Sequence, residues 1–382
     1  MPEPLPDLHI PPSSATVSVS IINTGGILRG ATTKMVVEPN IDGHEYLSVP
    51  CFAFLIENKA QSRTMVFDLG LKKDGQDLPP PLHERVIRDG WHITMPKTVR
   101  ELLDEQGGQV VDTANIEAVI WSHTHLDHVG DVGVFEPKTQ LIVGPGTKKA
   151  AFPGWPTVPD ATFREDEVAG RFVHELDFSG SFLRIGGLAA IDYFADGSFY
   201  FLDAPGHCPG HICGLARVTS DPDSFVFMGG DAFHHGGELR PSTWHPLPRS
   251  ISPNPFVCDG FSSTAAPSCP GEMFSELLPE GPEKPFYRPT TAKPSFHLDP
   301  AQALETIRHI QKSDAHDNIL VVSAHDVSIL NVVDFFPATA NDFMEKGWVS
   351  KMRWAWLADF AKAVGKDEDI PKRLFGDARA PK

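Results

Sequence analysis

The sequence contains no apolar run that approaches the roughly 20 residues of a membrane-spanning helix, which argues against a protein embedded in a bilayer. It also lacks an excess of basic residues, because 33 Lys and Arg against 50 Asp and Glu give a formal net charge of −17. Phosphate backbones and anionic membrane surfaces are bound by basic faces, so we expect neither nucleic acid nor a membrane as partner. The start of the chain shows no basic segment followed by an apolar one. We therefore expect no secretory signal and a cytoplasmic protein.

Cysteine is scarce as well, with five residues in 382. Cys258 and Cys269 lie in one loop and could pair, but free thiols are the better expectation for a chain without a signal. The hydrophobic fraction of 41% and the charged fraction of 22% are ordinary for a globular protein. The length fits two domains or one large α/β domain with an insertion.

Residues 1–15 are rich in proline and predict a flexible tail, followed by a single domain over residues 16–382. β-Branched and aromatic runs in "ATVSVSIINTGGILRG" and "LSVPCFAFLIENKAQSRTMVFDLGL" predict strands. "MPKTVRELLDEQGG" predicts a helix, and "NIEAVIWS" predicts a short buried strand. The second half repeats this content, with strands in "SFYFLD", "SFVFM" and "NILVV" and a helix in "LDPAQALETIRHIQKS" that Asp299 would cap. An amphipathic helix is expected at about 349–364.

Residues 236–298 break this pattern, because they are dense in proline, glycine and serine. A structureless loop of such length inside a compact domain is usually functional or disordered. The aromatic residues scattered through it argue against simple disorder. We interpret the segment as an insertion that packs over the body of the protein; the alternative is a flap that only hides a sheet edge.

The stretch "SHTHLDHVGD" places three histidines and two aspartates directly after a predicted strand. Alternate residues of an extended segment project to the same side, so His123 and His125 can reach one metal ion. Asp127 and His128 follow where the chain turns towards a helix, and they can serve a second ion nearby. Asp131 is better interpreted as a residue that starts a helix.

Three further polar residues follow the ends of later predicted strands, namely His207, Asp231 and His325. Taken singly, they are typical of a turn histidine, a helix cap and a polar strand end. Taken together with the first stretch, four strands that end in His or Asp at one expected sheet edge indicate a metal site. Nitrogen and oxygen ligands suit zinc and also tolerate manganese, iron or cobalt.

With these motifs the chain resembles the metallo-β-lactamase-fold hydrolases over roughly residues 16–335. The resemblance implies an α/β fold, a four-layer αββα sandwich with a long loop-rich insertion, whose site lies along one edge. It also implies two divalent metal ions, most readily Zn²⁺, with Mn²⁺ or Fe²⁺ as alternatives. The first ion would be held by His123, His125 and His207. The second would be held by Asp127, His128 and His325, and Asp231 would bridge the two.

Asp68 matches an acidic residue that this family carries after an early strand, and we expect Asp68 and His211 to orient ligands. No ligand position is cysteine, although Cys208 neighbours one, which places the chain with the lactonase- and glyoxalase-like branch. It is most similar to the quorum-signal lactonases. These carry a tyrosine three residues after the bridging aspartate, where this chain has His234.

The resemblance implies a dinuclear hydrolase that opens a lactone or lactam. A hydroxide shared by two metal ions attacks the carbonyl carbon, and Asp127 or Asp231 passes a proton to the departing atom. A neutral His234 can still donate one hydrogen bond to the oxyanion, unless it simply faces solvent. The expected partner is a small molecule that is cyclic and partly apolar, and a homodimer is one candidate assembly.

Two other activities of the same fold remain open. A thioesterase acting on an acyl or polyketide thioester would use the same site. An iron-dependent persulfide dioxygenase uses a mononuclear site and does not need Asp127 or His325 as ligands, so their presence argues against it. A binding protein without catalysis should have lost ligands, whereas the full set is present.

Overall fold

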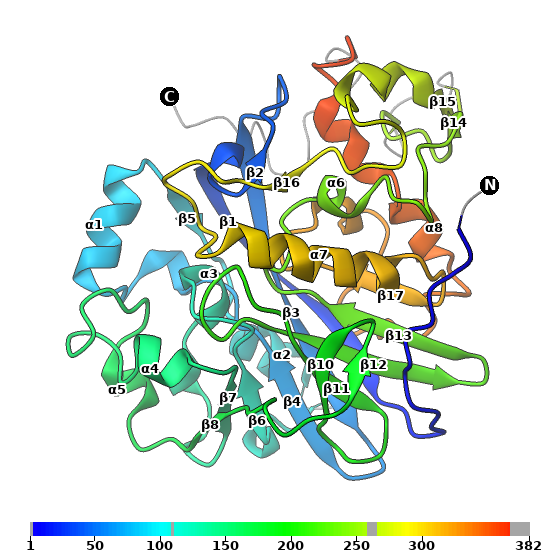
Figure 1. The fold of residues 1–382 in the computed structure, drawn as a ribbon. Helices are drawn as coiled ribbons and strands as arrows, with labels where there is room; N and C mark the ends of the chain where they lie inside the picture. Colours follow the sequence, from blue (N-terminus) through cyan, green and yellow to red (C-terminus); the bar gives the residue numbers. More distant parts are fainter. Residues whose placement is uncertain (1–2, 108–110, 258–265, 367–382) are drawn as a thin grey trace.

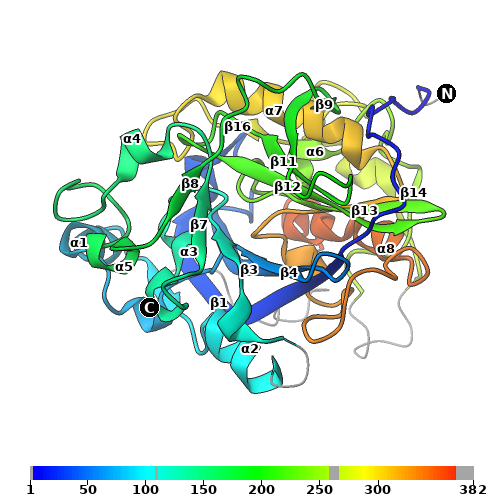
Figure 2. The same ribbon diagram turned by 90° about the horizontal axis from the view of Figure 1, so that it is seen from below.

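The computed structural model describes residues 3–107, 111–257 and 266–366 (Figure 1). Two β-sheets lie face to face and helices cover their outer faces, which gives the expected four-layer αββα sandwich (Figures 1 and 2). Two short antiparallel pairs, β2 (Val37–Glu38) with β16 (Arg288–Pro289) and β14 (Ser250–Ile251) with β15 (Cys269–Pro270), accompany them. No helix in the described ranges is both long and apolar enough to cross a membrane.

The first sheet has seven strands in the order β5-β1-β3-β4-β6-β7-β8. They are β1 (Ser18–Thr32), β3 (Tyr46–Asn58), β4 (Arg63–Phe67), β5 (His92–Thr94), β6 (Ala118–Ile120), β7 (Gln140–Val143) and β8 (Val173–Glu175). Strands β1, β3 and β4 pair antiparallel, and the pairs from β4 through β8 are parallel. The carboxyl ends of β4 and β6 therefore lie at the same edge.

The second sheet has six strands in the order β17-β13-β12-β11-β10-β9. They are β9 (Arg184–Ile185), β10 (Leu188–Asp192), β11 (Phe199–Asp203), β12 (Ile212–Ser220), β13 (Asp223–Met228) and β17 (Ile319–Val322). All pairs are antiparallel except β13 with β17. Strands β11, β13 and β17 consequently run in one direction and end at one edge.

The helices are α1 (Pro80–Arg88), α2 (Val99–Gly107), α3 (Leu126–Val129), α4 (Thr147–Ala151), α5 (Glu165–Val168), α6 (Gly236–Leu239), α7 (Pro300–Asp314) and α8 (Trp348–Met352). Short 3-10 helices are η1 (Thr33–Met35), η2 (Lys73–Gly75), η3 (Thr113–Asn115), η4 (Val132–Val134), η5 (Gly271–Leu277), η6 (Val327–Ile329) and η7 (Ala355–Phe360). The predicted helix after Asp299 is confirmed as α7, and the Asp299 side chain accepts a hydrogen bond from the Gln302 N–H as its cap.

The apolar runs of the strands pack on both faces of each sheet. In β3, Phe52 and Phe54 point between the sheets, while Ala53 and Leu55 pack beneath α2. Burial on both faces removes the alternation of apolar and polar residues that a half-exposed strand shows. This is why these strands appear in the sequence as nearly continuous apolar runs.

The segment that we expected to be a flexible tail instead contacts the rest of the protein from residue 3 onwards. Leu8 is buried in the apolar cluster on the outer face of that sheet. The buried Arg217 donates a hydrogen bond to the Pro11 carbonyl at 2.6 Å. A proline-rich segment forms few backbone N–H bonds, but its carbonyls remain acceptors for side chains of the domain.

The expected helix at about 349–364 is two short helices, α8 and η7. The Arg353 carbonyl between them accepts hydrogen bonds from the Arg240 guanidinium and the Trp356 indole, each at 2.9 Å. These side chains therefore satisfy the carbonyl at the point where the chain bends. The next residue, Trp354, has a non-helical φ of −124°.

The insertion and the C-terminal segment share an apolar cluster. Phe256, Phe274 and Phe286 of the insertion pack with Trp356 and Phe360 of the C-terminal segment. The described part of residues 236–298 therefore covers one end of the sandwich with buried aromatic rings. Cys258 lies outside the described residues, so the expectation of free thiols at Cys258 and Cys269 stays a prediction.

Candidate metal centre

Five strand ends bring polar residues to one edge of the sandwich. The residues that follow β4, β6, β11, β13 and β17 include Asp68, His123, His207, Asp231 and His325. All of them are buried. Parallel strand direction within each sheet places these carboxyl ends together, as the sequence pattern predicted.

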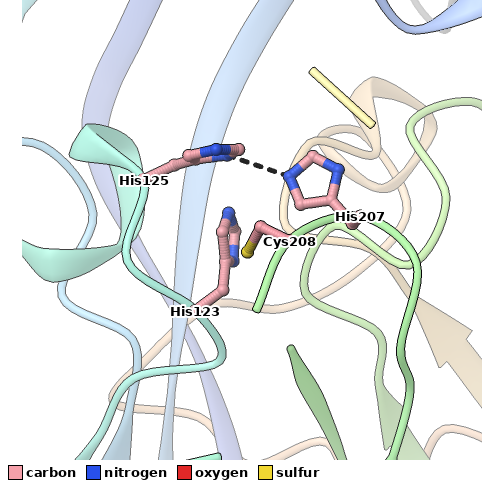
Figure 3. A group of neighbouring side chains, drawn as sticks. All are labelled: His123, His125, His207 and Cys208. Carbon is pink, nitrogen blue, oxygen red and sulfur yellow. Dashed lines mark hydrogen bonds between the residues drawn. The ribbon is translucent and has the colours of Figure 1, made fainter. Parts of the chain in front are cut away.

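The first three predicted ligands form one group. His125 and His207 approach through Nδ1 and Nε2 at 2.9 Å, and the rings of His123 and His125 lie 4.6 Å apart between centroids (Figure 3). One nitrogen of each of these histidines and the Cys208 sulfur all lie within 4.8 Å of one another. The spacing suits a shared metal ion, and it also places the Cys208 thiol beside the group.

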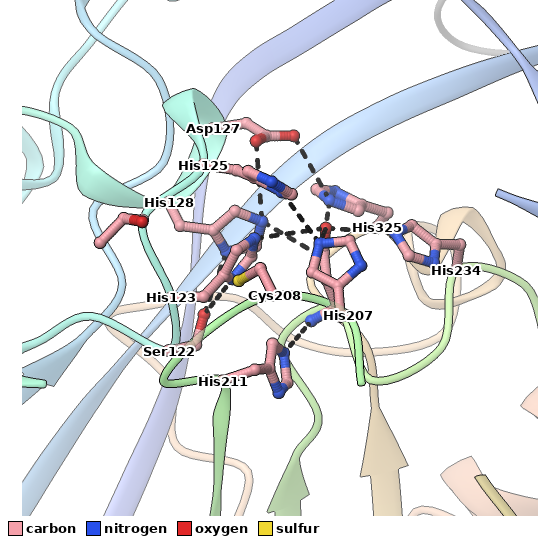
Figure 4. A network of polar contacts seen from close by, with 12 residues as sticks. Ser122, His123, His125, Asp127, His128, His207, Cys208, His211, His234 and His325 are labelled. Atoms are coloured by element: carbon pink, nitrogen blue, oxygen red, sulfur yellow. Dashed lines mark hydrogen bonds and ion pairs between the residues drawn. The ribbon is translucent and has the colours of Figure 1, made fainter. Parts of the chain in front are cut away.

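Asp127, His128 and His325 form a second group, and Figure 4 shows these three side chains close to the first group. The His325 Nε2 lies 3.5 Å from an Asp127 oxygen, and the His128 Nε2 lies 3.8 Å from the other. Ligand atoms of Cys51, Asp127 and His325 also lie within 4.8 Å of one another. The sequence analysis missed Cys51, because nothing near it in the chain marks a site.

Asp231 faces both groups with different oxygens. Its Oδ2 lies 3.7 Å from the His123 Nε2 and 3.5 Å from the His207 Nε2. Its Oδ1 lies 3.1 Å from the His128 Nε2 and 2.9 Å from the His325 Nε2. A carboxylate that bridges two ions needs this arrangement.

Hydrogen bonds on the far side of the rings set their orientation. The His128 Nδ1–H donates to Asp68 at 2.8 Å, and the His325 Nδ1–H donates to the Pro50 carbonyl at 2.7 Å. Asp68 also accepts from the N–H and the hydroxyl of Ser122 at 2.7 and 2.8 Å. Both histidines therefore turn Nε2 towards the site, as metal-binding histidines with such partners do.

Gly230 and His211 hold the backbone of Asp231. A Cβ at Gly230, where φ is +50°, would lie 2.9 Å from the His211 ring and 3.0 Å from Ser122, so a side chain would not fit. The His211 Nδ1–H donates to the Ala204 carbonyl, and its Nε2 accepts the Asp231 N–H at 2.9 Å. His211 has no nitrogen left for a metal ion and orients Asp231 instead.

The chemistry of these atoms fits divalent cations. The His123 Nε2, the His128 Nε2 and the Asp231 Oδ1 are buried and have no hydrogen-bond partner among the described residues. Burial lowers the pKa of His123 and His207 well below the usual range and that of His125 to about 4, so these rings are neutral and carry lone pairs.

His128 behaves differently, because neighbouring carboxylates oppose the effect of its burial. Burial lowers the pKa of His128, but Asp231 and Asp68 raise it further, to well above the usual value. The site thus attracts positive charge. A bound cation would take the place of that proton, since ligands must be deprotonated.

His234 points into the site rather than into solvent. It is buried, and its Nε2 lies 3.2 Å from the Asp231 Oδ2. His297 of the insertion, which the sequence analysis missed, packs against the rings of His207 and His234 at 5.3 and 5.2 Å. Its Nε2–H donates to the Val36 carbonyl at 2.9 Å, a contact across 261 residues that no local pattern reveals.

A cavity of about 940 Å³ adjoins the candidate metal centre. Members of both ligand groups and His234 line it, together with apolar side chains from the first sheet, from α1 and from the insertion. The volume suits a drug-sized molecule rather than a single small ring.

Comparisons with known proteins agree with this geometry. The model of the Metallo-beta-lactamase superfamily matches residues 49–253. The chain is 42% identical over 374 residues to the Gamma-lactamase FDB1 of Fusarium pseudograminearum, covering 96% of this chain and 87% of that protein. It is 41% identical over 380 residues to the Metallo-hydrolase mfmC of Annulohypoxylon moriforme, covering 97% of each.

A solved structure of an N-acyl homoserine lactone hydrolase, with the product N-hexanoyl-L-homoserine bound at its catalytic metal centre, aligns with a TM-score of 0.52. The alignment covers 85% of this chain and 99% of that one at 15% identity, which shows a shared fold. Together with the family model and the long alignments to the two relatives, the convergent His and Asp residues establish that the chain belongs to the metallo-β-lactamase superfamily.

Proposed function

We propose that the protein opens a cyclic ester or cyclic amide, a lactone or a lactam, at a centre of two divalent metal ions, most readily Zn²⁺. Its family and relatives make it a metal-dependent hydrolase. The observation that carries the two-metal proposal is Asp231, whose two oxygens face two separate groups of histidine nitrogens. The ring-opening reaction is supported by the γ-lactamase relative and by the lactone hydrolase of the same fold.

Two bound ions would supply a Lewis acid for the carbonyl oxygen and a water of lowered pKa as the nucleophile. The chain's own residues supply the rest. His123, His125 and His207 would hold one ion, and Asp127, His128 and His325 the other. The Asp127 side chain borders the cavity and is 14% exposed, so it can pass a proton to the departing atom of the opened ring.

His234 is our candidate for the group that stabilises the oxyanion. Its Nε2 lies 3.2 Å from the Asp231 Oδ2, so a hydrogen on this nitrogen would face the centre where the oxyanion would form. Glu238 accepts hydrogen bonds from the N–H groups of His234 and His235 at 2.6 and 3.3 Å and so holds this backbone. A donor held in place beside the centre is what oxyanion stabilisation needs.

The proposal is tested by a hydrolysis panel on zinc- and manganese-loaded protein. It contains γ-phenyl-γ-butyrolactone, the matching γ-lactam and an acyl phenyl thioester, with Asp127→Asn as the control. We expect the wild type to open a ring substrate and the variant to lose most of this activity, because it lacks the carboxylate that would hold the second ion and pass the proton. Product is measured by chromatography, and bound metal by elemental analysis.

Other outcomes would favour the alternative activities. Turnover of the thioester without either ring would make the protein a thioesterase at the same site. Oxygen consumption with a persulfide and one iron per chain, with no acyl substrate turned over, would overturn the proposal. A homodimer and a cytoplasmic location stay predictions from the sequence.

Replacing His234 with alanine is expected to lower kcat by about 10²-fold and to change KM little, because a donor that acts on the oxyanion stabilises the transition state. Steady-state kinetics on the best ring substrate measure both constants. His83→Ala, an exposed histidine on α1, is the matched control. An unchanged kcat for His234→Ala with every good substrate would remove this residue from the mechanism.

A further inference from the structure

A second group of polar residues lies outside the ligand groups but in reach of the same cavity. It consists of His44, His235, Tyr287 and Asp359, which we call the His44 cluster. His44, His235 and Tyr287 are buried, and the Asp359 side chain is 11% exposed. All except Tyr287 line the cavity that adjoins the metal centre. His44 comes from the β2–β3 connection, His235 from the residue before α6, Tyr287 from the insertion and Asp359 from η7.

His235 holds the Asp359 carboxylate in a defined orientation. The His235 Nδ1 accepts a hydrogen bond from the Gly237 N–H at 3.0 Å, so this nitrogen carries no proton. The proton of the neutral ring is therefore on Nε2, which lies 3.2 Å from the Asp359 Oδ2 and donates to it. The carboxylate is thus oriented by a buried partner, as binding groups in preorganised sites are.

The same tautomer argues against a third metal ion here. Ligand atoms of His44, His235 and Asp359 lie within 4.8 Å of one another, a spacing that a metal ion could bridge. A metal ion would need the lone pair of the His235 Nε2, so the proton on this nitrogen would have to move to the Nδ1. Because the Nδ1 faces the Gly237 N–H, it cannot take the proton. The cluster is built for hydrogen bonding instead.

His44 and Tyr287 complete the cluster. The His44 Nδ1 and the Tyr287 Oη lie 2.8 Å apart, and the His44 ring packs 4.8 Å from the His235 ring. Burial raises the pKa of Tyr287, so its phenol stays neutral. Asp359 supplies the carboxylate of the cluster.

Three of the four residues of the cluster lie outside the stretch that the family model matches. That stretch is residues 49–253, which include His235 but not His44, Tyr287 or Asp359. Tyr287 comes from the insertion and Asp359 from the C-terminal segment. Binding residues are often carried by such segments on a rigid scaffold.

We propose that the His44 cluster binds a hydrogen-bond donor of the substrate, a hydroxyl or a neutral amine, at a position remote from the carbonyl that is attacked. This rests on the proposed function. A carboxylate accepts hydrogen bonds only, so Asp359 selects a donor. Leu28, Val36 and Leu47 line the cavity as well and suit an apolar body. The substrate class is a hydroxy- or amino-substituted lactone or lactam with an apolar ring.

The test compares two probes that differ by one hydroxyl, γ-phenyl-γ-butyrolactone and its para-hydroxyphenyl analogue. Asp359→Asn and His235→Gln should raise KM for the hydroxylated lactone roughly 10- to 100-fold, the range for hydrogen bonds to charged groups, and leave the other lactone unchanged. The value of kcat should change little, because the group acts at a distance from the carbonyl. The control is Asp42→Asn, an exposed carboxylate that pairs with Lys362 at the rim.

Binding of a probe that cannot be hydrolysed separates this proposal from the proposed function. Calorimetry with para-hydroxyphenyl tetrahydrofuran and with phenyl tetrahydrofuran needs no turnover. If both variants bind the hydroxylated ether more weakly and the other ether as the wild type does, the result supports the proposed role of the cluster. This holds even if no lactone or lactam is opened, because that outcome would contradict only the proposed function. Equal changes in the affinity for both ethers, or no change in either variant when both have wild-type circular dichroism spectra, would overturn the proposed role of the cluster. The proposed ring opening would not be affected.

Discussion

Replacing Asp231 with alanine is expected to lower kcat/KM by at least about 10³-fold and to reduce the bound metal below two ions per chain. The two oxygens of this side chain lie between 2.9 and 3.7 Å from four histidine nitrogens, two from each ligand group. Metal ions contribute several kcal/mol of transition-state stabilisation, and each 1.36 kcal/mol is a factor of about ten in rate. Elemental analysis and steady-state kinetics on one protein preparation measure both effects.

Asp131→Ala is the matched control for this experiment. Asp131 lies in the same histidine-rich stretch, but its side chain accepts a hydrogen bond from the Gly133 N–H and caps η4, as the sequence predicted. This variant should keep its metal content and most of its activity. Two ions per chain and near wild-type kinetics in Asp231→Ala would contradict the bridging role.

Replacing Asp314 with alanine is expected to lower the free energy of unfolding by about 3–5 kcal/mol, because it leaves the buried Arg240 guanidinium without its anion. The Arg240 Nε donates to Asp314 at 2.7 Å, and its Nη2 donates to the second carboxylate oxygen. The pair joins the start of the insertion to the end of α7, and Arg240 also binds the Arg353 carbonyl. Urea unfolding followed by tryptophan fluorescence measures the change.

The control for Asp314→Ala is Glu305→Ala on the same helix. Glu305 pairs with Arg308 in solvent, with both side chains more than half exposed, and such pairs contribute about 0–1 kcal/mol. Equal effects of the two substitutions would contradict the buried-pair argument.

Burial raises the pKa of Asp314, but Arg240 lowers it to below the ordinary 3.8. Since its folded pKa is depressed, the pair stabilises the fold above pH 3.8, and this contribution is lost as the pH falls through the folded pKa.

The predicted strands and the predicted ligand groups depend on information that lies close together in the chain. An apolar run followed by His or Asp marks both the strand and the atom at its end, as at His123 and at Asp231. Because strands of one direction end at one edge, four such local signals predict one site. The cap of α7 by Asp299 is equally local, since the bond spans three residues. These features could be predicted without knowing the packing.

Other parts of the site arise only from the tertiary structure. His297 meets Val36 across 261 residues, and His44 meets Tyr287 across 243. Arg240 meets the Arg353 carbonyl across 113 residues, at the bend between α8 and η7 where one helix was expected. None of these partners carries a periodic or motif signal, because each contact depends on how the insertion and the chain ends lie on the sandwich. The sequence by itself therefore determined the edge where the candidate metal ligands converge, whereas the long-range packing decided which side chains surround the cavity beside it.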